Sequence, residues 1–364
     1  MTDKILKEEE RVAFALRALY KKYGYLPYKM SKFEEYDLYV ANKEFLDGDG
    51  VITFTDTDGK LLALKPDVTL SIIKNSADGK GNRKVYYNEN VYRISGGTKQ
   101  FKEIPQAGLE CIGDIDAYDV FETVYLAAGS LAKVSEKFVL DISHLGILFA
   151  TLQEIGKGEG FEKEVMRCLG EKNAHALSAV CENYTVTEKD AEKLQILLSS
   201  YGEPQSVLKK IQPICQTEKA KTAFAQLEKL CTLLGSTEYA DKLRLDFSVV
   251  NDRNYYDDIV FKGFVDGIAD GVLSGGRYDK LMQRMGKKSG GIGFAVNLDL
   301  LEGFNRQANG QDVDVLVLYD ETTPLEKVAE TVREQTQTAF SVRAQKQKEG
   351  VRYQTLVDIT GGSL

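Results

Sequence analysis

The chain has 364 residues, of which 43% are hydrophobic and 28% are charged. These fractions are typical of a globular protein with a sizeable core, and the length favours two or three domains. The formal net charge of −8, without a Lys/Arg stripe, argues against a nucleic-acid partner.

Cysteine and histidine usage disfavours several chemistries. Only two histidines are present, and no C-x-x-C pair occurs among the five cysteines, Cys111, Cys168, Cys181, Cys215 and Cys231. We therefore expect free thiols, no disulfide framework, no metal and no cofactor. The start MTDKILKEEERVAF lacks the apolar stretch of a signal peptide, and no window approaches the ~18 apolar residues of a membrane span. A cytoplasmic protein without membrane contact is expected.

The first part of the chain alternates helices with strand pairs. Apolar spacing predicts a helix over 3–24, and turn signals predict a hairpin over 45–64 with arms at 51–54 and 61–64. Helix and strand signals then follow in the order helix 68–76, strand 83–95, strand 103–113, helix 117–137, strand 138–142 and helix 144–155.

The residue composition changes twice in the second part of the chain. Leu, Lys, Glu, Ala and Gln dominate residues 157–240, which predicts a helical insertion with a capping box at Thr187 and Asp190. Strand signals return from 243 in LRLDFSVVN, DIVFKGFVDG and GVLSGGRY, followed by a helix at 278–285 and by the glycine-rich SGGIGFAVN, which leads into a helix near 298–305. After the linker RQANGQD, the segment VDVLVLYD, a helix at 323–339 and a strand near 351–359 predict a small α/β tail.

The order of these elements predicts an α+β fold: an antiparallel sheet with flanking helices, interrupted by inserted helices. The expected division is a core from 1–156 and 241–308, a helical insertion over 157–240 and a C-terminal α/β tail over 309–364.

The segment IPQAGLECIG places candidate binding residues on one face of a strand. Gln106, Gly108 and Glu110 alternate, so they share a face, and the glycine leaves a hollow floor between an amide and a carboxylate. Such a carboxylate accepts hydrogen bonds from an ammonium or an imidazole. The alternative is the exposed polar face of a half-buried strand.

Further candidates come from neighbouring segments. Arg93 shares a strand face with Glu89 and Val91, and its planar fork suits a carboxylate or phosphate as well as a surface salt bridge. Asp67 and Thr69, in LKPDVT, offer acceptors to a ligand or cap the next helix.

The tyrosine pair of NDRNYYDDIVF is typical of the wall of a small polar pocket. LSGGRYDKL and GGIGFAVNLDLL match no phosphate-binding motif. Their glycines instead indicate strands whose backbone is closely approached by another group.

Five segments in one order resemble the catalytic core of class II aminoacyl-tRNA synthetases, most closely the histidyl one, over about residues 1–305. VYRISGGTKQFKEIPQAGLECIG resembles motif 2, NDRNYYDDIVF and SGGRYDKL resemble the two histidine signatures, GIGFAVNLDLL resembles motif 3, and LALKPDVT resembles the substrate-amine segment. The resemblance implies that Asp67, Thr69 and Gln106 face the amine of a bound histidine. It implies that Glu110 and Tyr256 face the imidazole, and it includes Arg93, Tyr255 and Tyr278 in the pocket.

The departures from that family fall on residues that activate the amino acid with ATP, and its amine-contacting glutamate is the shorter Asp67 here. An arginine of the first histidine signature is replaced by Asn251, the motif 3 arginine by Leu300 and an acidic residue of motif 2 by Ser95. Fixed cations stabilise the charge that develops during adenylate formation, and losing one such group costs on the order of 10²- to 10³-fold in rate. The substitutions predict a protein with no catalytic residues of its own.

A synthetase-like core with lost arginines and a short tail resembles the regulatory subunits of ATP phosphoribosyltransferase, the first enzyme of histidine biosynthesis. That resemblance implies a non-catalytic subunit that is required for activity and for feedback inhibition by histidine. It implies a short-form catalytic subunit as partner, a homodimer within a hetero-octamer, histidine as effector and no tRNA.

Two other interpretations stay open on the sequence. One is a divergent, active histidyl-tRNA synthetase, and the other is a synthetase-derived binding module for another enzyme. The residues also leave open whether histidine binds the old substrate pocket or a subunit interface.

Overall fold

A computed structural model describes residues 6–41, 50–76, 81–94, 100–250, 255–302, 304 and 311–361. Ser95 and Asn251 lie outside these ranges. The chain forms two compact units, one spanning Glu9–Phe304 and a second that contains the C-terminal residues from Asn305 onward. No helix of the described ranges is long and apolar enough to cross a membrane.

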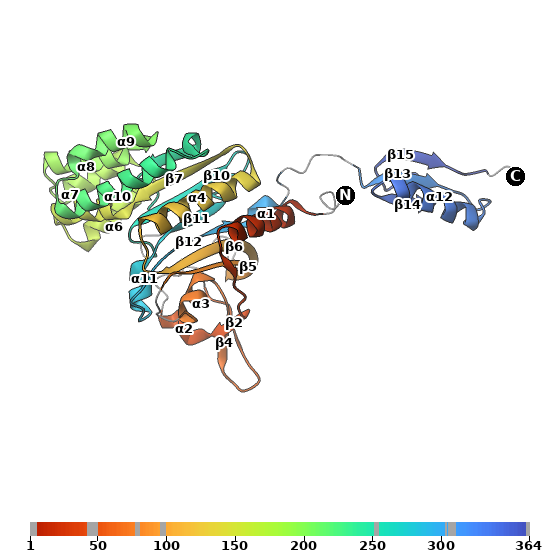
Figure 1. The fold of residues 1–364 in the computed structure, drawn as a ribbon, viewed down its shortest axis with the longest axis horizontal. Coiled ribbons are helices and arrows are strands. Elements are labelled where there is room, and N and C mark those ends of the chain that lie inside the picture. The colour runs from red at the N-terminus through yellow and green to blue at the C-terminus, as the bar shows by residue number, and fades with distance from the viewer. Residues whose placement is uncertain are drawn as a thin grey trace. The chain divides into compact units, whose positions relative to one another are not determined.

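A nine-stranded, mostly antiparallel sheet is the centre of the larger unit (Figure 1). Its strands, in spatial order, are β1 (Leu26–Pro27), β5 (Arg83–Ile94), β6 (Phe101–Gly113), β12 (Gly290–Asn297), β11 (Leu273–Arg277), β10 (Ile259–Val265), β7 (Phe138–His144), β9 (Leu243–Asp246) and β8 (Tyr201–Gly202). Only the pairs β1–β5 and β7–β9 are parallel. The antiparallel sheet that the sequence predicts is therefore confirmed.

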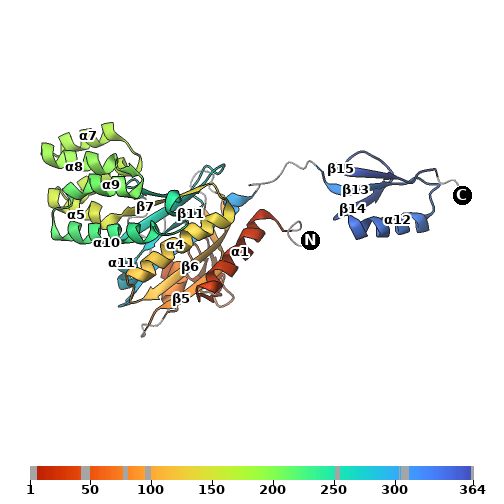
Figure 2. The ribbon, with the colours of Figure 1, turned by 45° about the horizontal axis from the view of Figure 1, so that its top comes forward.

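Two helices, α1 (Glu8–Lys22) and α4 (Ala117–Val134), lie against one face of this sheet (Figure 2). Asp116 begins α4 with a capping box, in which its carboxylate accepts from the backbone N–H groups of Tyr118 and Asp119. A Cβ added at Gly263 of β10 would meet the Leu131 side chain of α4 at 2.5 Å. The α4 side of the sheet is therefore closely packed, and the cavities described below open on the other side.

One row of residues crosses that other face. Directly opposed residues of antiparallel strands point to the same side of a sheet. The strand registers place in one row Tyr87, Gly108, Ala295, Ser274, Lys262 and Asp141.

A second, small sheet and three short helices border the same face. The small sheet contains β2 (Phe33–Glu35), β4 (Leu61–Leu64) and β3 (Thr53–Thr55), and the predicted hairpin is its β3–β4 pair. The short helices are α2 (Tyr36–Ala41), α3 (Thr69–Lys74) and α11 (Asp279–Arg284). Their apolar residues form a separate core with Tyr87 and Tyr278.

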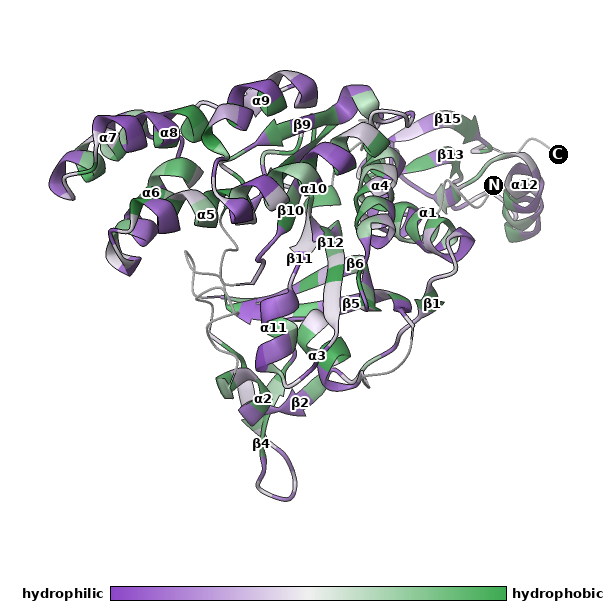
Figure 3. Cartoon of the chain, turned by 60° about the vertical axis from the view of Figure 1, so that its left-hand side comes forward, coloured by the Kyte–Doolittle hydropathy of each residue, from purple (hydrophilic) through white to green (hydrophobic). Residues whose placement is uncertain are grey.

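The predicted inserted helices are present. They are α5 (Leu145–Ile155), α6 (Glu159–Gly170), α7 (Ala174–Asn183), α8 (Glu188–Leu198), α9 (Pro204–Ile211), η3 (Gln212–Ile214), α10 (Glu218–Leu234) and η4 (Ala240–Lys242). Figure 3 shows hydrophobic and hydrophilic stretches on most of them, as amphipathic helices around a shared core require. Thr187 caps α8 by accepting from Asp190 N, and its hydroxyl donates to the Asp190 carboxylate at 2.7 Å.

The region after β12 differs from the prediction. Instead of a helix near 298–305, a short 3₁₀ turn, η5 (Leu298–Leu301), follows the strand. The C-terminal unit has the predicted α/β composition, with β13 (Val313–Leu318), α12 (Leu325–Thr338), β14 (Val342–Gln345) and β15 (Tyr353–Asp358) in a parallel sheet of order β14-β13-β15. The sequence analysis did not foresee β14.

Candidate functional site

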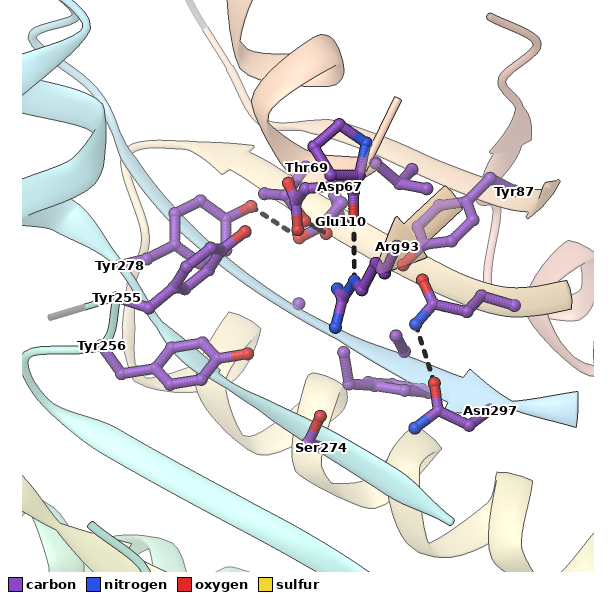
Figure 4. Close-up of a pocket in the computed structure, with 16 residues that line it drawn as sticks. Asp67, Thr69, Tyr87, Arg93, Glu110, Tyr255, Tyr256, Ser274, Tyr278 and Asn297 are labelled. Carbon is purple, nitrogen blue, oxygen red and sulfur yellow. Dashed lines mark hydrogen bonds between the residues drawn. The ribbon is translucent and has the colours of Figure 1, made fainter. Parts of the chain in front are cut away.

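A cavity on the open face of the sheet collects the predicted site residues. All eight candidates line it, although they come from separate segments: Asp67, Thr69, Arg93, Gln106, Glu110, Tyr255, Tyr256 and Tyr278 (Figure 4). Its volume is about 130 Å³. For comparison, an engineered cavity of roughly 150 Å³ admits benzene. The space therefore suits a ring-sized small molecule.

Glu110 of β6 is the most deeply buried acid of this cavity, with 2% of its surface exposed. One carboxylate oxygen accepts from the Thr69 hydroxyl at 2.5 Å, and the other accepts from the Tyr278 hydroxyl at 2.6 Å. Burial raises the pKa of Glu110 to about 8, and the two hydroxyl hydrogen bonds oppose that rise. Each carboxylate oxygen has a second lone pair, so the group is able to accept a further donor from a ligand.

Glycines on the neighbouring strands make room for these side chains. A Cβ at Gly293 of β12 would lie 1.8 Å from Glu110 Oε2, and one at Gly291 would lie 2.2 Å from the Tyr278 ring. At Gly276 of β11, a Cβ would approach the Tyr256 ring to 2.7 Å. The two glycine-rich segments are strands closely approached by side chains of the cavity wall, as the sequence analysis expects.

The first turn of α3 supplies the acceptors opposite the sheet. Asp67 Oδ1 accepts from Leu70 N at 2.8 Å, and Tyr255 donates a further hydrogen bond to the same carboxylate. Asp67 thus combines both roles considered from the sequence, since it binds the start of a helix and also lines the cavity. Desolvation raises the pKa of Asp67, while the hydrogen bond from Leu70 and the charge of Arg93 lower it.

Arg93 and Gln106 line the cavity from β5 and β6. The Arg93 side chain donates from Nε to the carbonyl oxygen of Pro66 at 3.0 Å, and its guanidinium extends into the cavity (Figure 4). Glu89, on the same strand face, instead pairs with the buried Lys65 at 2.6 Å. Gln106 Nε2 donates to Asn297 Oδ1 at 2.7 Å.

Three polar lining residues were missed by the sequence analysis: Tyr87, Ser274 and Asn297. Tyr87 corrects one expectation, because the space beside Gly108 is not hollow. A Cβ there would meet the Tyr87 hydroxyl at 2.5 Å and the carbonyl oxygen of Phe294 at 2.2 Å. The alternation of 83–95 puts Tyr87 on the Glu89 and Arg93 face, and this pattern was the available signal.

The position of the lost motif 3 arginine is the turn η5. Leu300 is half-buried there. Burial raises the pKa of the adjacent Asp299 carboxyl, while the charges of Lys102 and Arg93 lower it. A branched alkyl group and a carboxyl make this turn unfavourable for a phosphate. The other two substituted positions, Ser95 and Asn251, are outside the described residues.

The cavity favours a small cation or a hydrogen-bond donor. Two carboxyls face a single arginine, and tyrosines, hydroxyls and the amides of Gln106 and Asn297 supply the remaining polar contacts. Across the described ranges, no group of three His, Cys, Asp or Glu side chains is placed to hold a metal ion. The chemistry of the residues present suits recognition of an amine or an imidazole.

Comparison with known proteins places the chain in a family. The sequence model described as histidyl-tRNA synthetase matches residues 3–301. The ATP phosphoribosyltransferase regulatory subunit of Caldanaerobacter subterraneus subsp. tengcongensis is 29% identical over 317 residues, which cover 84% of this chain and 82% of that protein.

Two solved structures have the same fold. One is an ATP phosphoribosyltransferase regulatory subunit/histidyl-tRNA synthetase from Bacillus halodurans, with a TM-score of 0.76, 24% identity and coverage of 98% of this chain and 95% of that one. The other, from the ATP phosphoribosyl transferase (HisG:HisZ) complex of Thermotoga maritima, has a TM-score of 0.63, 17% identity and coverage of 79% and 96%. These likenesses confirm the class II synthetase-like fold.

Proposed function

Because the chain belongs to the histidyl-tRNA synthetase family, we propose that it works as the non-catalytic regulatory subunit of ATP phosphoribosyltransferase. The observation that carries this proposal is a contrast between the cavity and the turn that follows β12. The cavity around Glu110 is lined by all eight residues that the resemblance assigns to an amino-acid pocket, whereas the phosphate-binding position of the family holds Leu300. The curated relative described above bears the name of such a subunit.

The partner in this proposal is a catalytic phosphoribosyltransferase subunit. The related complex from Thermotoga maritima contains a HisG chain beside the synthetase-like HisZ chain. For this chain we further propose a homodimer within a hetero-octamer and no role in tRNA binding. The formal net charge of −8 supports the latter.

Histidine is the proposed effector, and the Glu110 cavity is its proposed site. The imidazole donates a hydrogen bond to Glu110, with Tyr256 beside it. The α-ammonium faces Asp67, Thr69 and Gln106. Arg93 offers its guanidinium to the α-carboxylate, because a fork of N–H donors matches a carboxylate in two contacts.

The acidity of Glu110 sets a proton requirement for this ligand. Glu110 has a pKa of about 8, and a free imidazole has one of ~6.5. Between these two pH values, Glu110 and the imidazole together hold one proton before binding. One proton is also what a carboxylate–imidazolium contact, or its neutral tautomer, requires. Below this range binding releases a proton and above it binding takes one up, so histidine affinity should have a maximum near neutral pH.

Regulation follows if histidine binds two assembly states unequally. A ligand shifts an equilibrium only by its difference in affinity for the two states. A coupling of about 1–3 kcal/mol changes the affinity or population of the active state 5- to 150-fold. Such coupling is sufficient for feedback inhibition without any catalytic group in this chain.

The test is reconstitution with a short-form catalytic subunit. We expect phosphoribosyl transfer to require both chains and histidine to inhibit it. Glu110→Ala and Tyr256→Phe should weaken inhibition while the complex still assembles on size-exclusion chromatography. Unchanged inhibition in both variants would place the effector elsewhere, and histidine-dependent ATP–pyrophosphate exchange by the isolated chain would overturn the proposal.

A further inference from the structure

A second cavity opens on the same face of the sheet and adjoins the first. Its volume is about 510 Å³, against about 130 Å³ for the cavity around Glu110. Ser274 and Asn297 line both cavities. Both residues lie apart from Thr69 and Glu110 in Figure 4. The second cavity extends from there over β10, β7 and β9 to the end of α6 in the helical insertion.

A buried carboxylate without a partner lines this second cavity. Asp141 of β7 is 7% exposed, and its Oδ1 is buried without a hydrogen-bond partner among the described residues. Asp246 of β9 also lines the cavity, but its oxygens accept from Ser248 N and from Lys172 Nζ, both at 2.8 Å. Buried carboxylates are normally hydrogen-bonded or paired, so Asp141 lacks a donor that a ligand can supply.

A lysine directly opposite Asp141 also lacks an ion-pair partner. Lys262 of β10 is the register partner of Asp141, so the two Cβ atoms are roughly 4.5–5.5 Å apart on one face. Within the described part of the chain, however, Lys262 forms no ion pair. Its stem lies along Gly271, where an added Cβ would meet Lys262 Cε at 2.3 Å, and its ammonium sits 5.6 Å from the centre of the Phe264 ring.

The charged side chains that line the second cavity sum to zero. Its two carboxylates, Asp141 and Asp246, face two ammonium groups, Lys172 and Lys262. Since Asp246 and Lys172 pair with each other, one acceptor and one cation remain beside each other. A ligand that satisfies both needs a positive donor and a negative acceptor close together and no net charge. A sugar phosphate fits worse, because its anionic group would be bound beside two acids.

We propose that this cavity is a second ligand site and that it binds the ammonium-and-carboxylate head of a free amino acid. Asp141 accepts from the ammonium, and Lys262 donates to the carboxylate. Both groups of an amino acid stand on one carbon, which matches the adjacent positions of Asp141 and Lys262. Phe264 and Val260 line the same cavity and provide apolar surface for the side chain. The site goes beyond the proposed function and does not depend on what the first cavity binds.

The test uses the full chain with Glu110→Gln, which removes the buried one of the two carboxyls in the first cavity and so weakens any binding there. Each of the common L-amino acids is titrated in turn by calorimetry. We expect at least one to bind with a single-site isotherm. Adding Asp141→Asn or Lys262→Met should weaken that binding at least ~10-fold, the loss expected for one charged hydrogen bond. The methyl ester and the N-acetyl derivative of the same amino acid should also bind at least ~10-fold more weakly, since each loses one charge.

Controls separate binding from folding. Asp266→Asn and Lys137→Met alter an exposed pair at the end of the same two strands, outside the cavity lining, and should leave the affinity unchanged. Asp141→Asn should keep or raise the unfolding midpoint, because it removes a buried, unpaired carboxylate. The proposal is overturned if no amino acid binds, or if binding survives both Asp141→Asn and Lys262→Met. It also fails if Asp141→Asn and Lys262→Met each lower the unfolding midpoint of the free protein, as the loss of a direct ion pair between Asp141 and Lys262 would.

Discussion

The cavity around Glu110 and the turn at Leu300 share one strand, β12, which lines the cavity and ends directly before the turn, but they differ in how they are built. Glu110 is held by two hydroxyl donors and lies against Gly293, where any side chain would overlap its carboxylate. Leu300, in the turn that follows the same strand, is half-buried. The proposed amino-acid site therefore depends on backbone spacing within the sheet, whereas the phosphate contacts of the family depend on a few replaceable side chains. In a cleft of this kind, substitutions remove the phosphate-binding groups more easily than they close the amino-acid cavity.

The largest effect is expected from a substitution that closes the space beside Glu110. Gly293→Ala brings a Cβ to 1.8 Å from Glu110 Oε2 and to 2.4 Å from Leu109 O, so β12 and β6 must separate. We expect the free energy of unfolding to fall by more than about 4 kcal/mol and histidine binding to be lost. Urea unfolding measures the first effect and calorimetry the second.

Gly160→Ala is the matched control, because its Cβ would meet only the Tyr184 hydroxyl, at 3.1 Å. It should change stability by less than ~1 kcal/mol. A stable Gly293→Ala protein that still binds histidine would show that backbone spacing does not define the cavity.

The next largest effect is expected in the pH dependence of the free energy of unfolding. The raised pKa of Glu110, about 8, means that the folded protein favours the protonated acid. Its contribution to stability is complete below the unfolded pKa of ~4.3 and is lost as the pH rises through about 8.

Relative to Glu110→Gln, the wild-type protein should therefore lose stability on the order of a few kcal/mol over this range. Asp67 and Asp141 are present in both proteins, so the difference reports Glu110 together with its charge coupling to Asp67. Parallel stability curves for the two proteins would contradict this assignment of the raised pKa.

Histidine affinity gives a third measure. Glu110→Gln keeps the size of the side chain but removes its charge, and a hydrogen bond to a charged group contributes about 1.5–3 kcal/mol. We expect the Kd for histidine to rise roughly 10- to 100-fold at neutral pH, measured by calorimetry. The affinity maximum between pH ~6.5 and about 8 should disappear with the carboxylate. A variant with wild-type affinity would remove Glu110 from the proposed site.

The smallest effect is expected at Leu300. Leu300→Arg restores one cation, but Ser95 and Asn251 remain substituted, so no ATP–pyrophosphate exchange should appear. Histidine affinity should change less than ~2-fold, because the turn does not line the cavity. Leu300→Met is the volume-matched control. Exchange activity in Leu300→Arg would show that the loss of phosphate chemistry rests on one residue.

Local pattern predicted much of the architecture and the site. Strand alternation placed Gln106 and Glu110 on one face, and the structure brings both into the cavity. The motif resemblance supplied what alternation cannot, since Asp67 and Tyr278 are far from Glu110 in sequence yet meet it in the fold. That all eight candidates line one cavity is a structural fact, whereas their binding of histidine remains a proposal.

The misses share a physical origin in long-range pairing. Tyr87 fills the space beside Gly108 because β5 and β6 pair in that register, and no local spacing specifies it. Asn297 contributes through its contact with Gln106, across the β6–β12 pair. The state of Asp141 has the same origin, because only the sheet reveals that Lys262 opposes it, and among the described residues the two form no ion pair.

One short strand ties the inserted helices to the rest of the larger unit. β8 (Tyr201–Gly202) comes from within the insertion and completes the edge of the nine-stranded sheet against β9. If the insertion swung away as a rigid arm, it would break those backbone hydrogen bonds and expose the sheet edge to aggregation. The insertion and the sheet should therefore melt in a single cooperative transition, and proteolytic nicking near residue 201 should loosen both together.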